Sequence, residues 1–166
     1  MITVLTIQIL LVALFVGAAI WNKRELPDSI SAIVYELKKP YQFLWTVAIW
    51  IISFLFVYPM MVIMAGTWQF VGFLTIVCLL FTGAMPLIPG SHNTAHNVLG
   101  VSAGILSQIC VLIICPYWLL MWMLFLIISI DAWFAVKERF YDHKACIIAE
   151  FICYVSLVGA LLTHNY

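Results

Sequence analysis

Residues 96–136 read HNVLGVSAGILSQICVLIICPYWLLMWMLFLIISIDAWFAV, an apolar run of 41 residues. As a single α-helix this run would extend about 60 Å, twice the roughly 30 Å hydrocarbon core of a membrane. Pro116 lies at its midpoint, where it would break a helix, and the next residues, Tyr117 and Trp118, are typical of the membrane interface. We therefore predict two membrane-spanning helices here, at about 96–115 and 117–136.

The composition of the whole chain agrees with a membrane protein. Of the 166 residues, 66% are hydrophobic and only 8% are charged, about a third of the roughly 25% usual in soluble domains. So few charged side chains cannot cover the surface of a soluble globule. The formal net charge is zero, which leaves no basic face for nucleic acid. The composition therefore predicts a polytopic membrane protein and excludes nucleic-acid binding.

Four other apolar stretches approach or reach the length of about 20 residues that a spanning helix needs. They lie at about 2–21, 42–65, 69–87 and 145–164. No basic residue precedes the first stretch, so we interpret it as a retained membrane helix rather than a cleaved signal peptide. The sequence thus predicts an all-α fold, an integral membrane bundle of six transmembrane helices forming a single domain over 1–166.

The basic residues predict the orientation of this bundle. Six spans put both termini on one side of the membrane, and all seven basic residues then lie on the other side: Lys23, Arg24, Lys38, Lys39, Lys137, Arg139 and Lys144. Loops rich in lysine and arginine remain in the cytoplasm. We therefore predict a multi-pass protein of the cell membrane with its basic loops cytoplasmic and both termini outside.

The first cytoplasmic loop contains a short amphipathic pattern. Asp28 or Ser29, after Pro27, is a plausible helix N-cap. Apolar residues then recur at helical spacing, at Ile30, Ile33, Val34 and Leu37. The stretch is too short to span, so we predict an interfacial helix at about 29–39 that lies in the cytoplasmic membrane interface and ends at Pro40.

Three titratable side chains are predicted to lie close to the cytoplasmic surface. Asp131 and Glu150 are acidic residues inside predicted spans, at depths of roughly 8 and 9 Å from that side, and His96 opens its own span there. Ionisable groups within a membrane are costly, so they raise a functional hypothesis. We predict that these three residues share one polar ligand-binding pocket with His92, Ser29 and Ser31 at its mouth.

A zinc site is a sharper interpretation of the same region. His92 and His96 are four residues apart, the spacing that places two histidines on one helix face for zinc. With Asp131 they would form a metal site, although the chain lacks the H-E-x-x-H motif. The alternative is that both histidines lie among the lipid headgroups and hydrogen-bond to phosphate or to the serine loop. We expect no cofactor unless this zinc site forms.

The predicted fourth span carries a stripe of small and polar residues: His96, Gly100, Gly104, Ser107 and Gln108. Small residues at this spacing let helices approach closely, and Gln108 can hydrogen-bond across the contact. The stripe therefore predicts helix packing or a polar substrate track. Asp131 is also open to a structural interpretation, in which it reaches the interface or pairs with Lys137.

Tryptophan and cysteine side chains are interpreted as structural. Most of six tryptophans fall near the ends of predicted spans, where an interfacial belt is expected: Trp45, Trp50, Trp68, Trp118, Trp122 and Trp133. The five cysteines form no C-x-x-C pair and lie in apolar runs, as small core residues do.

The order of these features resembles a known group of proteins. The loop Pro27–Ala32 (PDSISA), the end of the third span at Phe81–Pro86 (FTGAMP) and the histidine His96 are similar to features of small six-helix bacterial membrane proteins grouped with the DRAM-like family. The acidic residue that often follows the proline in that group is replaced here by Leu87. The resemblance implies a six-helix membrane fold.

The chain is more distantly similar to the ceramidase-like membrane hydrolases. These seven-helix proteins bind zinc through histidines and an aspartate on one membrane face. The resemblance implies a metal-dependent hydrolase. This chain has six predicted helices and lacks the complete histidine set, because His143 lies in a loop and His164 lies at the opposite end of its span.

No complete catalytic constellation is visible in the sequence. We therefore expect a non-enzymatic protein that binds lipid or a small hydrophobic ligand, or that modulates another membrane protein. Two alternatives stay open: a metal-dependent hydrolase acting on lipid at the cytoplasmic face, and a small proton-coupled transporter using Asp131 and Glu150. The expected partners are membrane lipid, a second copy of the chain or another membrane protein.

Overall fold

The computed structural model describes residues 2–23, 29–31, 33–88, 93–127 and 140–164. Its elements are α1 (Ile2–Lys23), α2 (Ile33–Glu36), α3 (Lys39–Ile63), α4 (Gln69–Ala84), η1 (Met85–Leu87), α5 (Asn93–Ile114), η2 (Pro116–Leu120) and α7 (Phe140–Thr163). Helix also continues from η2 through residues 121–127. Every element of these described ranges is helical, which confirms the predicted all-α fold class.

Four of the helices are long and apolar enough to cross a membrane. They are Lys39–Ile63, Gln69–Leu87, Thr94–Ile114 and Ala145–Thr163. Two shorter apolar helices accompany them, at Thr6–Ala18 and Pro116–Ile127. These lengths agree with an integral membrane protein.

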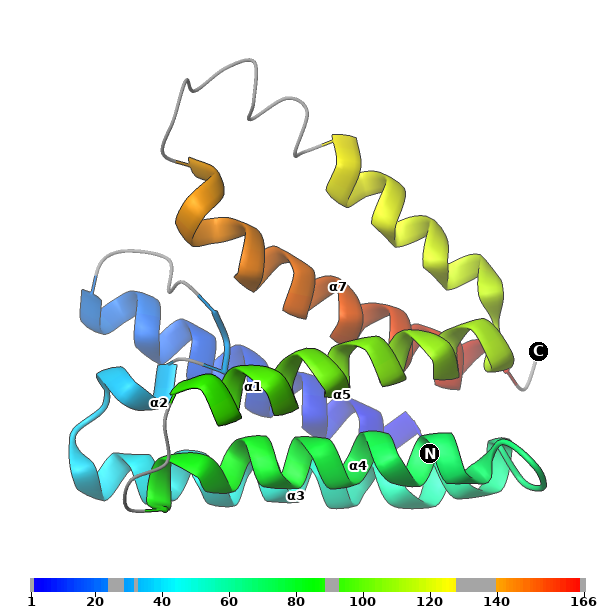
Figure 1. Cartoon of the computed structure of the whole chain (residues 1–166), viewed down its shortest axis with the longest axis horizontal. Helices are drawn as coiled ribbons and strands as arrows, with labels where there is room; N and C mark the ends of the chain where they lie inside the picture. The colour runs from blue at the N-terminus through cyan, green and yellow to red at the C-terminus, as the bar shows by residue number, and fades with distance from the viewer. Residues whose placement is uncertain (1, 24–28, 32, 89–92, 128–139, 165–166) are drawn as a thin grey trace.

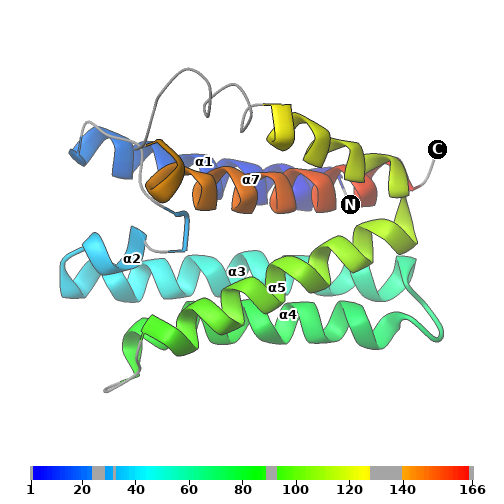
Figure 2. The ribbon, with the colours of Figure 1, turned by 45° about the horizontal axis from the view of Figure 1, so that its top comes forward.

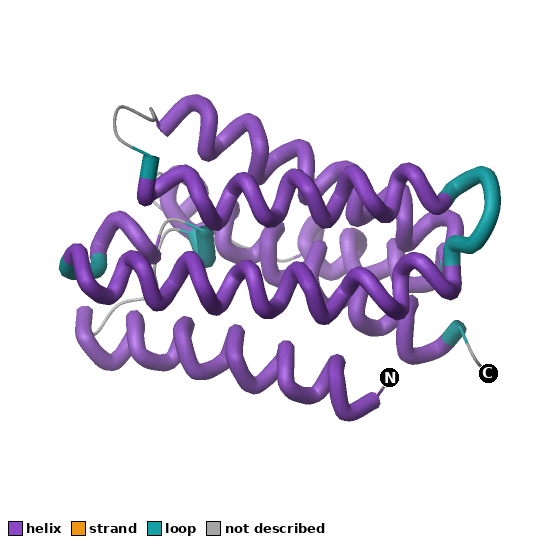
Figure 3. Tube along the Cα trace, turned by 90° about the horizontal axis from the view of Figure 1, so that it is seen from below, coloured by secondary structure: helices purple, strands orange, loops and turns teal. Residues whose placement is uncertain are grey.

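The long helices pack as one bundle. The middle helix α4 packs against both α3 and α5, α5 also packs against α7, and α1 packs on α3. Figure 2 shows α3, α4 and α5 lying together below α1 and α7. Both termini lie at the same end of the bundle, and α2 lies at the opposite end (Figures 1 and 3).

The hairpin of α3 and α4 is joined by a tight turn and held by hydrogen bonds. Gly66 adopts φ +102°, a left-handed conformation that glycine takes at little cost. At the other end of the hairpin, the Thr46 hydroxyl donates to the Gly83 carbonyl at 2.8 Å, and the Trp50 indole donates to the Leu80 carbonyl at 3.0 Å. These contacts fix the register of the two helices near the end where α2 lies.

The long apolar run breaks where Pro116 predicts. Helix α5 ends at Ile114, Cys115 is extended, and Pro116 begins the 3-10 helix η2. Pro116 cannot continue α5 because it lacks the backbone N–H and its ring clashes with the preceding turn. The predicted second half of this run, at 117–136, is described only as far as residue 127.

Several predicted helix boundaries differ from the observed ones by a few residues. Helix α3 begins at Lys39 rather than at 42, with Pro40 in its first turn. Proline is favoured there because the first helical N–H groups have no partner within the helix. Pro40 therefore starts a helix, whereas the sequence analysis assigned it to the end of one. Similarly, α5 begins at Asn93 rather than at 96, and α7 begins at Phe140 rather than at 145.

The predicted interfacial helix at 29–39 differs most from the structure. Among the described residues of this stretch, one helical turn forms before α3, at α2, and its apolar side chains pack against protein. Ile33 is 1% exposed and Val34 is fully buried, in a cluster with Trp45 on α3 and Phe15 on α1. The predicted apolar face exists. It packs against α1 and α3, however, and not against membrane lipid as the sequence suggested.

Candidate functional site

A cavity of about 750 Å³, partly open to the outer surface of the bundle, lies among the helices. Side chains from α3, α4, α5, α7 and the helical residues 119 and 122 line it, and most of them are aliphatic or aromatic: Ile49, Phe56, Leu79, Leu112, Trp122 and Leu157 among them. Ligand pockets in proteins are mostly apolar with few polar groups, and they typically measure about 300–1,000 Å³. The size and lining of this cavity therefore suit a small hydrophobic molecule.

One wall of the cavity carries a hydrogen-bonded cluster around Glu150. The carboxylate accepts hydrogen bonds from the Ile30 backbone N–H at 2.5 Å, from the Ser31 N–H at 3.3 Å and from the Ser31 hydroxyl at 2.6 Å. The hydroxyls of Ser29 and Ser31 are 3.2 Å apart. Glu150 thus holds the segment before α2 against α7.

His96 lies on α5 and lines the same cavity. Its side chain is 3% exposed, and its ring packs edge-on against Tyr35 of α2, with centroids 5.2 Å apart and an interplanar angle of 81°. The Thr82 backbone lies near the ring. However, neither ring nitrogen makes a well-formed hydrogen bond within the described part of the chain. Partial burial raises the pKa of the Tyr35 phenol, so Tyr35 stays uncharged beside His96.

The predicted site residues are therefore partly brought together. Ser31, His96 and Glu150 all line the cavity, and Ser29 adjoins Ser31. The other two predicted residues, His92 and Asp131, lie outside the described residues. Within the described ranges, no three His, Cys, Asp or Glu side chains are grouped as metal ligands. The zinc site of His92, His96 and Asp131 consequently stays a prediction.

Gln108 is the centre of a second polar cluster. Its amide nitrogen donates to the Ser107 hydroxyl at 3.1 Å and to the Cys153 carbonyl at 3.3 Å. Its side-chain oxygen accepts from the Trp122 indole at 2.9 Å and from the Ser156 hydroxyl at 3.1 Å. These four hydrogen bonds use the full capacity of a glutamine side chain. Gln108 thereby joins α5, α7 and the helix that follows η2, as its position in an apolar span had suggested.

We expect Gln108→Leu to destabilise the protein by about 1–2 kcal/mol, the upper range for hydrogen bonds between membrane helices. Leucine has a similar size but leaves the Trp122 indole without its acceptor. Unfolding in detergent by chemical denaturant measures the change. In a double-mutant cycle, Trp122→Phe should cost little once Gln108 is already Leu. A Gln108→Leu protein as stable as the original would show that the cluster contributes nothing to stability.

The small-residue stripe on α5 serves packing and also borders the cavity. A Cβ atom at Gly100 would lie 3.8 Å from a Thr82 methyl group, and one at Gly104 would lie 3.7 Å from the Cys153 sulfur, both ordinary contacts. Both glycines also line the cavity. The two interpretations of the stripe, packing and a substrate track, are therefore compatible.

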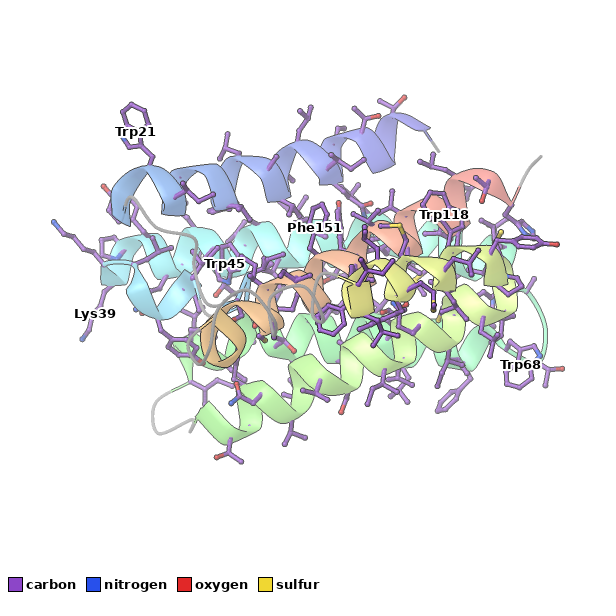
Figure 4. All side chains as sticks on the ribbon, turned by 90° about the horizontal axis from the view of Figure 1, so that it is seen from above. Trp21, Lys39, Trp45, Trp68, Trp118 and Phe151 are labelled. Carbon is purple, nitrogen blue, oxygen red and sulfur yellow. The ribbon has the colours of Figure 1, made fainter. Side chains whose placement is uncertain are left out.

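The sequence analysis missed two residues of this region. Trp45, labelled in Figure 4, was assigned to an interfacial belt. It is 2% exposed, lines the cavity and packs edge-on against Phe15, with ring centroids 5.1 Å apart. Tyr154 has a buried hydroxyl with no hydrogen-bonding partner in the described ranges, and it also lines the cavity. Its position one helical turn after Glu150 was the available sequence signal.

Comparisons with known proteins give no family for this chain. No family model matches it, and neither does any curated protein or solved structure. The resemblances to the DRAM-like group and to the ceramidase-like hydrolases therefore stay predictions.

Proposed function

We propose that the protein binds a membrane lipid or a similar hydrophobic molecule within its helix bundle, and that it does so without catalysing a reaction. The observation that carries this proposal is the apolar cavity of about 750 Å³ with hydrogen-bonding groups on its wall. An amphiphile has the same two parts, an apolar chain and a polar head. The alternatives, a zinc hydrolase and a proton-coupled transporter, both depend on Asp131, which is not among the described residues.

We further propose the membrane arrangement in which this binding takes place. Six spans would comprise the four long helices, α1 with its 22 residues, and the helix that begins at η2. An even number of spans agrees with the two termini lying at one end of the bundle (Figures 1 and 3). Lys39 lies at the opposite end (Figure 4), so the rule for basic loops makes that end cytoplasmic and the termini external.

Binding from a bilayer differs from binding from water. The hydrocarbon tails of the lipids around the protein are as apolar as the cavity wall, so moving a chain from the bilayer to the cavity gains little hydrophobic free energy. Selectivity must therefore come from shape and from the polar groups of the wall. Filling the cavity should accordingly reduce binding even though the protein remains surrounded by lipid.

We expect Gly100→Leu and Ala149→Leu to reduce ligand binding several-fold, because each places a larger side chain on the wall of the cavity. Binding is measured as photolabelling of the purified protein in lipid nanodiscs by an amphiphile with a diazirine in its hydrocarbon chain. Labelled peptides should come from α5 and α7 in the original protein. Gly17→Leu is the matched control, since a Cβ atom there would meet nothing within 4 Å.

If both cavity-filling variants are labelled on α5 and α7 as strongly as the original protein and the control, the proposed function is wrong. Thermal unfolding of each variant in detergent shows which of them keep the fold. If the Gly100 variant does not fold, the labelling of the Ala149 variant alone tests whether the cavity binds the ligand. The Ala149 substitution changes α7 and leaves the contact between α4 and α5 intact.

A further inference from the structure

Building on the proposed function, we propose that the ligand is an uncharged amphiphile with a hydroxylated headgroup, of the monoacylglycerol class, which His96 binds by its headgroup and Tyr154 by its ester. Both of these side chains line the cavity, and their buried polar atoms make no well-formed hydrogen bond with the described residues.

Most polar side chains on the cavity wall are already hydrogen-bonded within the protein. The hydroxyls of Ser53, Thr82 and Ser107 donate to backbone carbonyls of their own helices, at 2.7, 2.8 and 2.6 Å. The clusters around Glu150 and Gln108 are described above. Among the described residues, His96 and Tyr154 differ from these, because they line the cavity and their buried polar atoms make no well-formed hydrogen bond, although the Thr82 backbone lies near the His96 ring.

A buried polar group without a partner is costly, by about 1–3 kcal/mol in proteins. Native structures rarely keep such groups, and one explanation is a ligand that supplies the missing partner. Here two of them border one cavity of ligand size. The neutral imidazole of His96 carries one N–H donor and one acceptor nitrogen.

The chemistry of His96 selects among headgroups. A fully ionised carboxylate or phosphate offers acceptors only, so it would leave the acceptor nitrogen of the ring unpaired. An ammonium offers donors only and would leave the ring N–H unpaired. A headgroup with two hydroxyls can donate to one ring nitrogen and accept from the other. An uncharged headgroup also avoids placing a charge in a mostly apolar cavity.

Tyr154 requires a second group of the ligand, an acceptor for its hydroxyl. It lies one helical turn beyond Glu150 on α7, and its ring packs edge-on against Phe56 of α3, with centroids 6.3 Å apart. Its hydroxyl is a buried donor without a hydrogen-bonding partner among the described residues. The ester carbonyl that links a glycerol headgroup to its acyl chain is an acceptor in such a position. A glycerol ester therefore offers a hydrogen-bonding partner for each of the two side chains, and its acyl chain matches the apolar remainder of the cavity wall.

The test is a competition experiment in nanodiscs with the photoreactive amphiphile described above. Four competitors share the same hydrocarbon chain: monooleoylglycerol, oleic acid, oleylamine and octadecene. We expect monooleoylglycerol to compete about tenfold better than the others, which corresponds to one or two net hydrogen bonds. Its advantage should disappear in His96→Phe and shrink in Tyr154→Phe. His96→Gln should keep most of it, because an amide also carries a donor and an acceptor.

The outcomes separate this inference from the proposed function. If all four competitors displace the label equally, or if oleic acid or oleylamine displaces it best, the headgroup assignment is wrong while binding in the cavity stands. If none of them displaces the label and the cavity-filling variants keep it, the proposed function itself is wrong. The ranking of competitors on the original protein decides the inference even if the His96 variants do not fold.

Discussion

Glu150→Ala is expected to destabilise the protein by about 2–4 kcal/mol, because it removes the acceptor of three hydrogen bonds at once. Two of the three donors are backbone N–H groups, which cannot turn away to find another partner. The substitution should therefore release the segment before α2 from α7. Denaturant unfolding in detergent measures the loss of stability. Hydrogen exchange at the amides of Ile30 and Ser31 reports the release directly.

Glu150→Gln is the matched variant for this prediction. The amide oxygen can accept from both backbone N–H groups, and the amide nitrogen can donate to the Ser31 hydroxyl, so all three contacts are retained without the charge. We expect a loss below about 1 kcal/mol for this variant. An alanine variant that keeps slow exchange at Ile30 and Ser31 would show that Glu150 does not hold this segment. Equal losses for both variants would mean that the charge, rather than the hydrogen bonds, stabilises the contact.

The sequence could predict that Glu150 needs hydrogen-bonding partners, but it could not predict which groups those partners are. A carboxyl group in an apolar span needs a partner, and this physical argument holds without any structure. The sequence placed Ser29 and Ser31 near the same membrane surface, which made them candidates. Two of the bonds come from backbone N–H groups, however, and every residue except proline has one. Composition and spacing therefore cannot identify which backbone N–H groups donate to Glu150.

The burial of α2 shows a second limit. The spacing of Ile33 and Val34 predicts one apolar face, and the structure has such a face. The same pattern suits a helix on a lipid surface and a turn packed on protein, because both environments are apolar. Trp45 is ambiguous for the same reason, since a tryptophan near a span end suits an interfacial belt and a buried contact. Only the position of α1 and α3 distinguishes the two cases.

Pro116 was predictable because its effect is local. The ring excludes a continued helix whatever the surroundings are, and the break follows from the sequence alone. The role of a glycine inside a helix is different, since it depends on what the neighbouring element places opposite. Gly104 and Gly159 look alike in sequence, yet a Cβ atom at Gly104 would make an ordinary contact and one at Gly159 would overlap an indole ring.

Gly159→Ala is the second substitution for which we expect a large effect. A Cβ atom there would lie 2.5–2.6 Å from three ring atoms of Trp118, far inside van der Waals contact. The indole, labelled in Figure 4, is held in place because its N–H donates to the Thr163 hydroxyl at 3.0 Å, and Thr163 lies one turn along α7 from Gly159. A rigid ring cannot yield as a flexible chain end would, so η2 must move away from α7.

We expect Gly159→Ala to cost about 1–3 kcal/mol, as overpacked sites do, even though alanine favours a helix over glycine by about 1 kcal/mol. Gly104→Ala is the control, and it should leave stability unchanged or raised. Removing the ring tests the cause: in a Trp118→Ala background, Gly159→Ala should no longer destabilise, since the clash is gone. If Gly159→Ala still lowers stability in the protein without the indole, the loss arises within α7. The close contact between η2 and Gly159 would then not explain why this position is a glycine.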